Sequence, residues 1–185
     1  MKSVIIYESM FGNTHAVADA IAEGLRTEGE ATVVAAADAA KADLSDVDLL
    51  VVGGPTHAHG LPWLSTRKSA IQKAEASHGR LRAEPGAAEE YGLRAVLEAL
   101  PEGSHAGGEG SGAKHPAAAA FDTRRSGPAL LTGRASRAIA KRLRKRGYEP
   151  AAMPASFLVD RKEHLLNGEI DRAVAWGKSL AADRS

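Results

Sequence analysis

The stretch with the clearest chemical potential is a loop of six residues near the start of the chain: Ser9, Met10, Phe11, Gly12, Asn13 and Thr14. Two hydroxyl groups can donate hydrogen bonds there, and the glycine lets another group come close to the backbone. Asn13 or Thr14 can cap a following helix. The loop stands between a predicted strand and a predicted helix, so unpaired backbone N–H groups gather at the positive end of the helix dipole. These features predict a phosphate site that needs no lysine.

Hydrophobic spacing places this loop between two elements of regular structure. Residues 4–7 are rich in β-branched side chains and apolar on both faces, which is typical of a central parallel strand. Val17, Ile21 and Leu25 then recur every fourth residue, with charged residues on the other side. This spacing predicts an amphipathic helix that packs on a sheet, and Gly29 ends it as a C-terminal cap.

Three other kinds of phosphate-handling domain lack their defining residues. The chain has no G-x-x-x-x-G-K-[ST] loop, and no G-x-G-x-x-G follows its first strand, which excludes Walker-type nucleotide binders and the usual dinucleotide fold. A response regulator would need a phospho-accepting aspartate after the third strand, where this chain has Gly53, Gly54 and Pro55. The response-regulator class is therefore excluded as well.

The residues around the loop resemble the flavodoxin signature at its defining positions: Ile5, Ile6, Tyr7, Ser9, Gly12, Thr14, Ala18 and Ile21. The resemblance implies an α/β fold, a flavodoxin-like three-layer sandwich whose five-stranded parallel sheet has the order 2-1-3-4-5 with helices on both faces. A right-handed crossover between the first strands gives the same order 2-1-3. The resemblance also implies FMN as the cofactor, with its phosphate on residues 9–14 and its isoalloxazine ring on two later loops.

The first of these later loops follows the third predicted strand, and its candidate ligands are Pro55, Thr56, His57, Ala58, His59, Gly60 and Trp63. Glycines and prolines make it an irregular turn at the carboxyl end of a central strand. Trp63 is expected to stack on the flavin ring, and the alternative is a core anchor for the next helix. One of the two histidines is expected to donate a hydrogen bond to the flavin edge, with exposure to solvent as the alternative. A metal site is not favoured, because no third ligand accompanies them.

The second loop is predicted after a fourth strand at residues 117–121, and its candidate ligands are Asp122, Thr123 and Arg124. Phe121 is assigned to the core as the last residue of that strand. Arg124 and Arg125 would place positive charge near the ring, which predicts a two-electron potential above that of an ordinary flavodoxin. The alternative is that both arginines face solvent or pair with Asp122.

The remaining elements complete one predicted domain over residues 1–185. Strands are expected at residues 32–36, 49–52 and 157–159, and Pro154 favours the sheet edge for the last of them. Helices are expected at residues 66–77, 93–100 and 133–147, and from residue 167 onward. Residues 102–116 are rich in glycine and serine without an apolar anchor, so a flexible loop is expected there.

Composition sets limits on the class of protein. The 185 residues are 44% hydrophobic, enough for a sizeable core, and the absence of cysteine excludes disulfides and thiolate chemistry. No apolar run approaches the ~20 residues of a membrane span, and the chain enters its first strand at once, so a soluble cytoplasmic protein is expected. Charge is uneven: residues 1–115 hold 10 basic and 16 acidic side chains, and residues 116–185 hold 14 and 7.

These observations favour an FMN-binding, flavodoxin-like protein that takes part in electron transfer with a redox partner protein or a small-molecule electron acceptor. An electron carrier is favoured over a dedicated enzyme. Two alternatives stay open: an FMN-dependent NAD(P)H:quinone-type reductase, and a partner-binding protein on this fold without FMN. The basic helix at residues 134–146 lacks interleaved aromatic residues, so a solvated face or a docking surface for an acidic protein is favoured over nucleic acid. The oligomeric state is left open.

Overall fold

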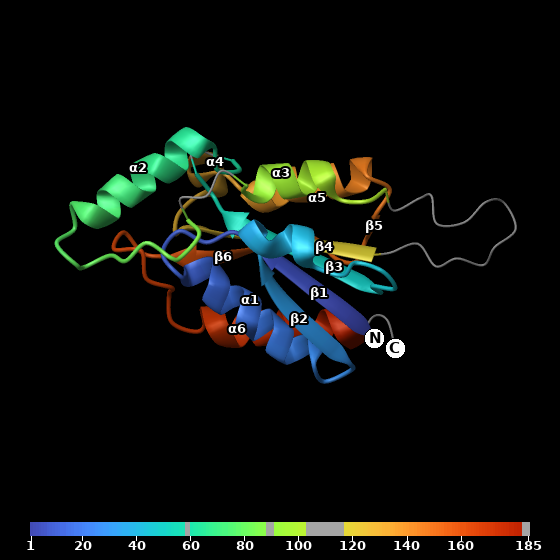
Figure 1. Cartoon of the computed structure of the whole chain (residues 1–185). Coiled ribbons are helices and arrows are strands. Elements are labelled where there is room, and N and C mark those ends of the chain that lie inside the picture. The colour runs from blue at the N-terminus through green and yellow to red at the C-terminus, as the bar shows by residue number, and fades with distance from the viewer. Residues whose placement is uncertain (58–59, 88–90, 103–116, 183–185) are drawn as a thin grey trace, which may run out of the picture.

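A parallel sheet forms the central layer of the computed structural model, which describes residues 1–57, 60–87, 91–102 and 117–182 (Figure 1). The strand order is β2-β1-β3-β4-β5, and β6 also pairs with β4. The predicted order 2-1-3-4-5 is confirmed, but the predicted number of five strands is one too few for the described residues. The strands are β1 (Lys2–Tyr7), β2 (Glu30–Ala35), β3 (Leu49–Pro55), β4 (Ala117–Arg125), β5 (Glu149–Pro150) and β6 (Ala155–Val159).

The extra strand arises because two short strands share the fifth position of the sheet. β5 pairs with the first two residues of β4, while β6 pairs with its last five. Between them lie Met153, whose side chain is 86% exposed, and Pro154. A proline has no N–H to donate to a strand ladder, so pairing is interrupted at this point.

Strand β4 is longer than the sequence pattern predicted. Residues 122–125 were expected to form a loop after Phe121, but they continue the strand, and this prediction is wrong. Asp122 lies opposite Gly54 of β3 and Ser156 of β6, so it is paired on both sides. The sequence pattern did not predict this part of the strand because its side chains are polar, and hydrophobicity is the main signal by which a buried strand is recognised.

Helices cover both faces of the sheet (Figure 1). One face carries α1 and α6, and the other carries α3 and α5, while α2 projects away to one side. The expected helices are present with shifted ends, and the four-residue helix α4 was not predicted. None of the helices in the described ranges combines the length and apolar character needed to cross a membrane. The helices are α1 (Asn13–Leu25), the 3-10 helix η1 (Ala36–Lys41), α2 (Leu64–Glu75), α3 (Leu93–Ala99), α4 (Ala129–Thr132), α5 (Ala135–Lys145) and α6 (Glu169–Ala182).

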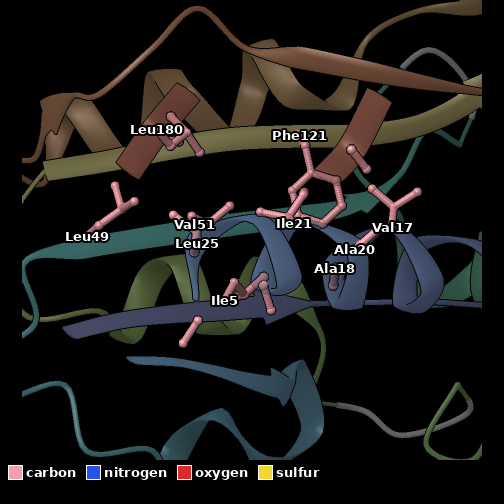
Figure 2. Packing of buried hydrophobic residues seen from close by; sticks show 14 of the residues in the cluster. Ile5, Val17, Ala18, Ala20, Ile21, Leu25, Leu49, Val51, Phe121 and Leu180 are labelled. Carbon is pink, nitrogen blue, oxygen red and sulfur yellow. The ribbon is translucent and has the colours of Figure 1, made fainter. Parts of the chain in front are cut away.

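The larger core cluster lies between the sheet and the α1–α6 layer (Figure 2). Ile5 and Val51 reach it from β1 and β3, and Ile21 reaches it from α1, all with no exposed surface. Phe121 is equally buried and meets Phe157 edge to face, with ring centroids 6.1 Å apart. The assignment of Phe121 to the core is therefore confirmed.

Two glycines allow α1 and α6 to lie in close contact. A Cβ atom at Gly177 would stand 2.3 Å from the carbonyl oxygen of Ile21, and one at Gly24 would stand 2.2 Å from that of Val174. Real Cβ atoms do not approach backbone oxygens so closely. The absence of side chains at both positions therefore allows the short distance between the two helices.

Residues 103–116 of the predicted flexible loop lie outside the described residues, as do Ala58 and His59 of the first ring loop. The expected flexibility of the Gly/Ser-rich segment therefore stays a prediction. The same holds for the single-domain organisation over residues 1–185.

Candidate functional site

A cavity of about 580 Å³ opens at the carboxyl ends of the central strands. This volume is within the ~300–1,000 Å³ typical of small-molecule sites. The cavity lies where the chain order of the sheet reverses between β1 and β3, the usual ligand position in open α/β sheets. Its walls come from the loop after β1, the end of β3, the end of β4, and one side of α2.

The loop after β1 has the geometry expected of an anion site. Gly12 has φ 85° and donates its N–H to Ser9 Oγ at 3.0 Å. The first hydrogen bond of helix α1 runs from the N–H of Ala16 to the Gly12 carbonyl, at 2.9 Å. The N–H groups of α1 before Ala16, which begin at Asn13, therefore have no carbonyl acceptor within the helix. A Cβ at Gly12 would meet nothing within 4 Å. Glycine suits this position because its backbone is left-handed. The open space beside it is consistent with the prediction that another group can come close to the backbone here.

Thr14 connects this loop to β4. Its Oγ1 lies 2.7 Å from Thr123 Oγ1, and both side chains are buried, with 1% and 5% exposed surface. One of the two hydroxyl groups donates its hydrogen to the other, so the hydrogen of the accepting hydroxyl can be donated to another group. Both residues line the cavity, so that hydrogen is available beside it.

The end of β3 supplies Pro55, Thr56 and His57 to the cavity wall. The N–H of Thr56 donates to the Thr123 carbonyl at 2.8 Å, and its Oγ1 accepts the N–H of Ala135 at 2.9 Å. His57 and Gly60 exchange two backbone hydrogen bonds of 2.8 Å. Burial lowers the pKa of His57, so the imidazole is neutral at pH 7 and offers one donor and one acceptor.

Trp63 does not line the cavity. Its side chain is 60% exposed, and the guanidinium carbon of Arg94 lies 3.6 Å from its ring centroid. The backbone N–H of Trp63 donates to Thr66 Oγ1 at 2.9 Å, at the start of α2. The expected stack on a flavin ring is therefore not supported by its position, and the alternative of a buried core anchor is wrong. Gly60 and Gly12 also lie outside the cavity lining.

Asp122 is not a cavity residue either. It is fully buried on β4, and its Oδ2 accepts the N–H of Ser136 at 2.8 Å, which caps the first turn of α5. Burial raises the pKa of this carboxyl group, and the hydrogen bond from Ser136 opposes the rise. The assignment of Asp122 to the flavin ring is corrected, because its side chain points into the layer between β4 and α5.

The two arginines at the end of β4 have different surroundings. Arg124 is 8% exposed, and its Nη1 donates to the carbonyls of Arg125 and Gly127 and to Thr132 Oγ1, at 3.2, 3.0 and 2.8 Å. Arg125 instead reaches Glu163 Oε1 at 3.2 Å. The alternative that these arginines pair with Asp122 is therefore wrong for both. The charge of Arg124 thus lies beside the cavity, and neutral acceptors surround it. A carboxylate compensates the charge of Arg125.

Comparison with known proteins identifies the fold. Residues 4–73 match the family model described as a flavodoxin domain. The structure of flavodoxin 2 from Bacillus cereus is similar, with a TM-score of 0.62 and 19% identity over 98% of this chain and 99% of that one. The chain has the flavodoxin fold. A flavodoxin from the domain Archaea gives a TM-score of 0.59 and 16% identity over 98% of this chain and 97% of that one. No curated protein matches the sequence.

Several lining residues of this flavodoxin fold were not expected from the sequence: Thr66, Ser69, Leu131, Thr132, Val159 and Glu163. Thr66 and Ser69 are three residues apart on α2, so their shared face was available as a signal. Glu163 makes contacts to three separate elements: its carbonyl accepts Asn13 Nδ2 at 2.7 Å, and its Oε1 meets Lys73 at 2.6 Å as well as Arg125. No local pattern identifies such a residue, because its neighbours are distant in sequence.

Proposed function

We propose that this protein binds FMN in the cavity and takes part in electron transfer. The observation that carries the proposal is the meeting of the phosphate-type loop, residues 9–14, with Thr123 at the ends of β1 and β4. A flavodoxin-like fold alone does not assign a ligand, whereas the residues at this site favour a phosphate-bearing one. When bound, FMN would supply the redox chemistry, and the protein would supply binding and electrostatics.

The residues at the inner end of the cavity suit a phosphate group. Backbone N–H groups at the start of α1 carry the positive end of the helix dipole, as a dianion requires. Ser9 and Thr14 add hydroxyl groups, both buried and both on the cavity wall. The phosphate would therefore replace the water that these donors need in its absence.

The outer part of the cavity has both apolar and polar walls. Phe11, Pro55 and Leu131 offer apolar surface, and Thr56 and His57 offer hydrogen-bonding groups beside it. A flat heterocycle with polar edges needs this combination. Neutral His57 can donate a hydrogen bond without bringing a full charge to the ring.

The surface charge favours an acidic redox partner. Four basic side chains of α5 are exposed: Arg137, Lys141, Arg144 and Lys145. Complementary charge speeds the encounter of two proteins and orients them. A protein that presents an acidic surface to α5 is thus the expected electron donor or acceptor.

A reductase that oxidises NAD(P)H is the second candidate. The specific observation in its favour is the buried charge of Arg124 beside the cavity, with no carboxylate bonded to it in the described part of the chain. Positive charge there would stabilise the additional negative charge of a reduced flavin. Such a site suits transfer of two electrons to a small acceptor.

Anaerobic kinetics with the FMN-loaded protein test the proposal and separate its two forms. The carrier form predicts that NADH and NADPH reduce the protein no faster than they reduce free FMN, while the dithionite-reduced protein passes electrons rapidly to ferricyanide. The reductase form predicts saturable oxidation of NADH or NADPH with a quinone as acceptor. A protein that retains no FMN after reconstitution and gel filtration would contradict both forms.

A further inference from the structure

A second hollow also borders Arg124. It is a groove of about 410 Å³ between β6 and the starts of α5 and α6. Arg124 lines both the groove and the cavity, whereas Arg134 and Arg172 line the groove alone. The groove is thus a separate site that shares one wall residue with the cavity.

Positive charge dominates the groove. Three arginines line it, and Glu169 is the one acidic residue among its described lining residues. Glu169 is already engaged, because its Oε2 accepts the N–H of Leu158 at 3.1 Å and a hydrogen bond from Arg172. In the described part of the chain, neither Arg124 nor Arg134 has a carboxylate within 4.0 Å. The charges of Arg124 and Arg134 are therefore uncompensated within the described protein.

Arg124 is the buried member of this group. Only 8% of its surface is exposed, and its Nε atom is buried with no acceptor in hydrogen-bonding range. The Nε atom of Arg134 is in the same condition. A buried charge with unsatisfied donors is costly unless a counter-charge approaches it, and an anion in the groove would supply that charge.

Arg172 also lines the groove, and two contacts hold its guanidinium group. Its guanidinium carbon lies 4.4 Å above the centroid of the Phe157 ring, and its Nη2 donates to the Ser156 carbonyl. Guanidinium groups present planar pairs of donors that fit phosphate oxygens. Apolar atoms of Pro154, Ala155 and Leu158 form the rest of the wall. The groove therefore has a charged part and an apolar part.

We infer that this groove is a second anion site, which binds the phosphate group of a small phosphorylated molecule between Arg124, Arg134 and Arg172. A doubly charged phosphate matches three guanidinium groups better than a single carboxylate does. The phosphate could be free or carried on an organic body that contacts the apolar wall. The inference does not depend on FMN binding, because Arg134 and Arg172 lie outside the flavin cavity.

Nuclear magnetic resonance titration of the ¹⁵N-labelled full chain tests the inference, with inorganic phosphate and phenyl phosphate as probes. Saturable shifts of the Ser156, Leu158 and Arg172 amides are expected, whether or not FMN is present. Shifts confined to residues 9–14, or no saturable shift, would overturn the inference. Tighter binding of phenyl phosphate would indicate an organic phosphate, and equal binding would indicate free phosphate.

The variant Arg134→Gln provides the decisive comparison, because it removes one charge from the groove without breaking any hydrogen bond described for that side chain. Its dissociation constant for the better probe should rise at least about tenfold, as expected for loss of one charged hydrogen bond. The control Arg137→Gln removes an exposed charge of α5 that does not line the groove, and should change the constant by less than about twofold. Equal weakening by both variants would indicate diffuse attraction to α5 and would overturn the site.

Discussion

The hydroxyl oxygens of Thr14 and Thr123 lie 2.7 Å apart in the interior, although 109 residues separate them in the chain. This hydrogen bond joins the first turn of α1 to β4 at the edge of the cavity. It means that the phosphate-type loop is supported by the strand whose end forms the opposite wall. A change at either threonine should therefore affect binding of the phosphate part of a ligand more than binding of its ring.

The variant Thr14→Val should weaken FMN binding at least about tenfold, because it removes a donor from a site where charged hydrogen bonds contribute roughly 1.5–3 kcal/mol each. The affinity for riboflavin, which lacks the phosphate, should change little. Thr14→Ser retains the hydroxyl group and serves as the control, with an FMN affinity close to that of the parent protein. Fluorescence titration measures all three. An equal loss of affinity for FMN and riboflavin would indicate a general distortion of the cavity.

Asp122 should make stability depend on pH. Burial raises its folded-state pKa above the ordinary value of 3.8, so its stabilising contribution is complete below pH 3.8 and is lost as the pH rises through the folded-state pKa. Asp122→Asn keeps an oxygen for the Ser136 N–H but cannot ionise. The free energy of unfolding of the parent protein should therefore fall relative to that of the variant as the pH rises.

Urea denaturation of both proteins from about pH 4 to pH 8 measures this difference, and each unit of pKa shift corresponds to about 1.4 kcal/mol. The buried carboxyl group of Glu8 also has a raised pKa, mainly from burial, but it is present in both proteins and cancels in the comparison. A difference that does not vary with pH would mean that Asp122 has an ordinary pKa.

The contact between α1 and α6 should not tolerate an added methyl group. Gly177→Ala would force its Cβ against the Ile21 carbonyl, and overpacking of this kind costs about 1–3 kcal/mol of unfolding free energy. Gly60→Ala adds the same methyl group where nothing lies within 4 Å, and should change stability by less than about 0.5 kcal/mol. Chemical denaturation of the two variants tests the contrast, and equal effects would refute the role assigned to the glycine pair.

Arg124 and Arg125 should differ in their effect on the potential of bound FMN. Arg125→Gln should change the two-electron potential little, because the Arg125 side chain is 55% exposed and solvent screens its charge, while Glu163 keeps its ion pair with Lys73. Arg124→Gln should lower the potential by roughly 30 mV or more, which for two electrons corresponds to about 1.4 kcal/mol. Potentiometric titration of the three FMN-loaded proteins checks this order, and a larger effect of Arg125→Gln would be the contrary result.

The resemblance to the flavodoxin signature implied the strand order, and local patterns in the sequence predicted the position of the main loop. Val17, Ile21 and Leu25 identified α1 by spacing alone, since one face of that helix is buried throughout. The polar end of β4 was missed because Asp122 is buried for its hydrogen bond to α5, a contact that appears only after folding. A buried polar strand end has no hydrophobic signal to distinguish it from a loop.

The sequence predicted only part of the site. Ser9, Thr14 and Thr123 line one cavity, because the loop after β1 and the end of β4 both lie at the carboxyl edge of the sheet. The direct hydrogen bond between Thr14 and Thr123 was not predicted. Trp63 was misplaced, since an aromatic residue near a ligand loop carries no information on which way its ring points. Here the guanidinium of Arg94 occupies its face, and the two residues are 31 positions apart in sequence.

Titration of the cofactor-free protein with FMN and, separately, with riboflavin is the most direct test of the central claim. One FMN should bind per chain, at least about tenfold more tightly than riboflavin, because the phosphate adds charged hydrogen bonds at the start of α1. Absence of FMN binding, or equal affinity for FMN and riboflavin, would contradict the claim that residues 9–14 hold the phosphate of a flavin.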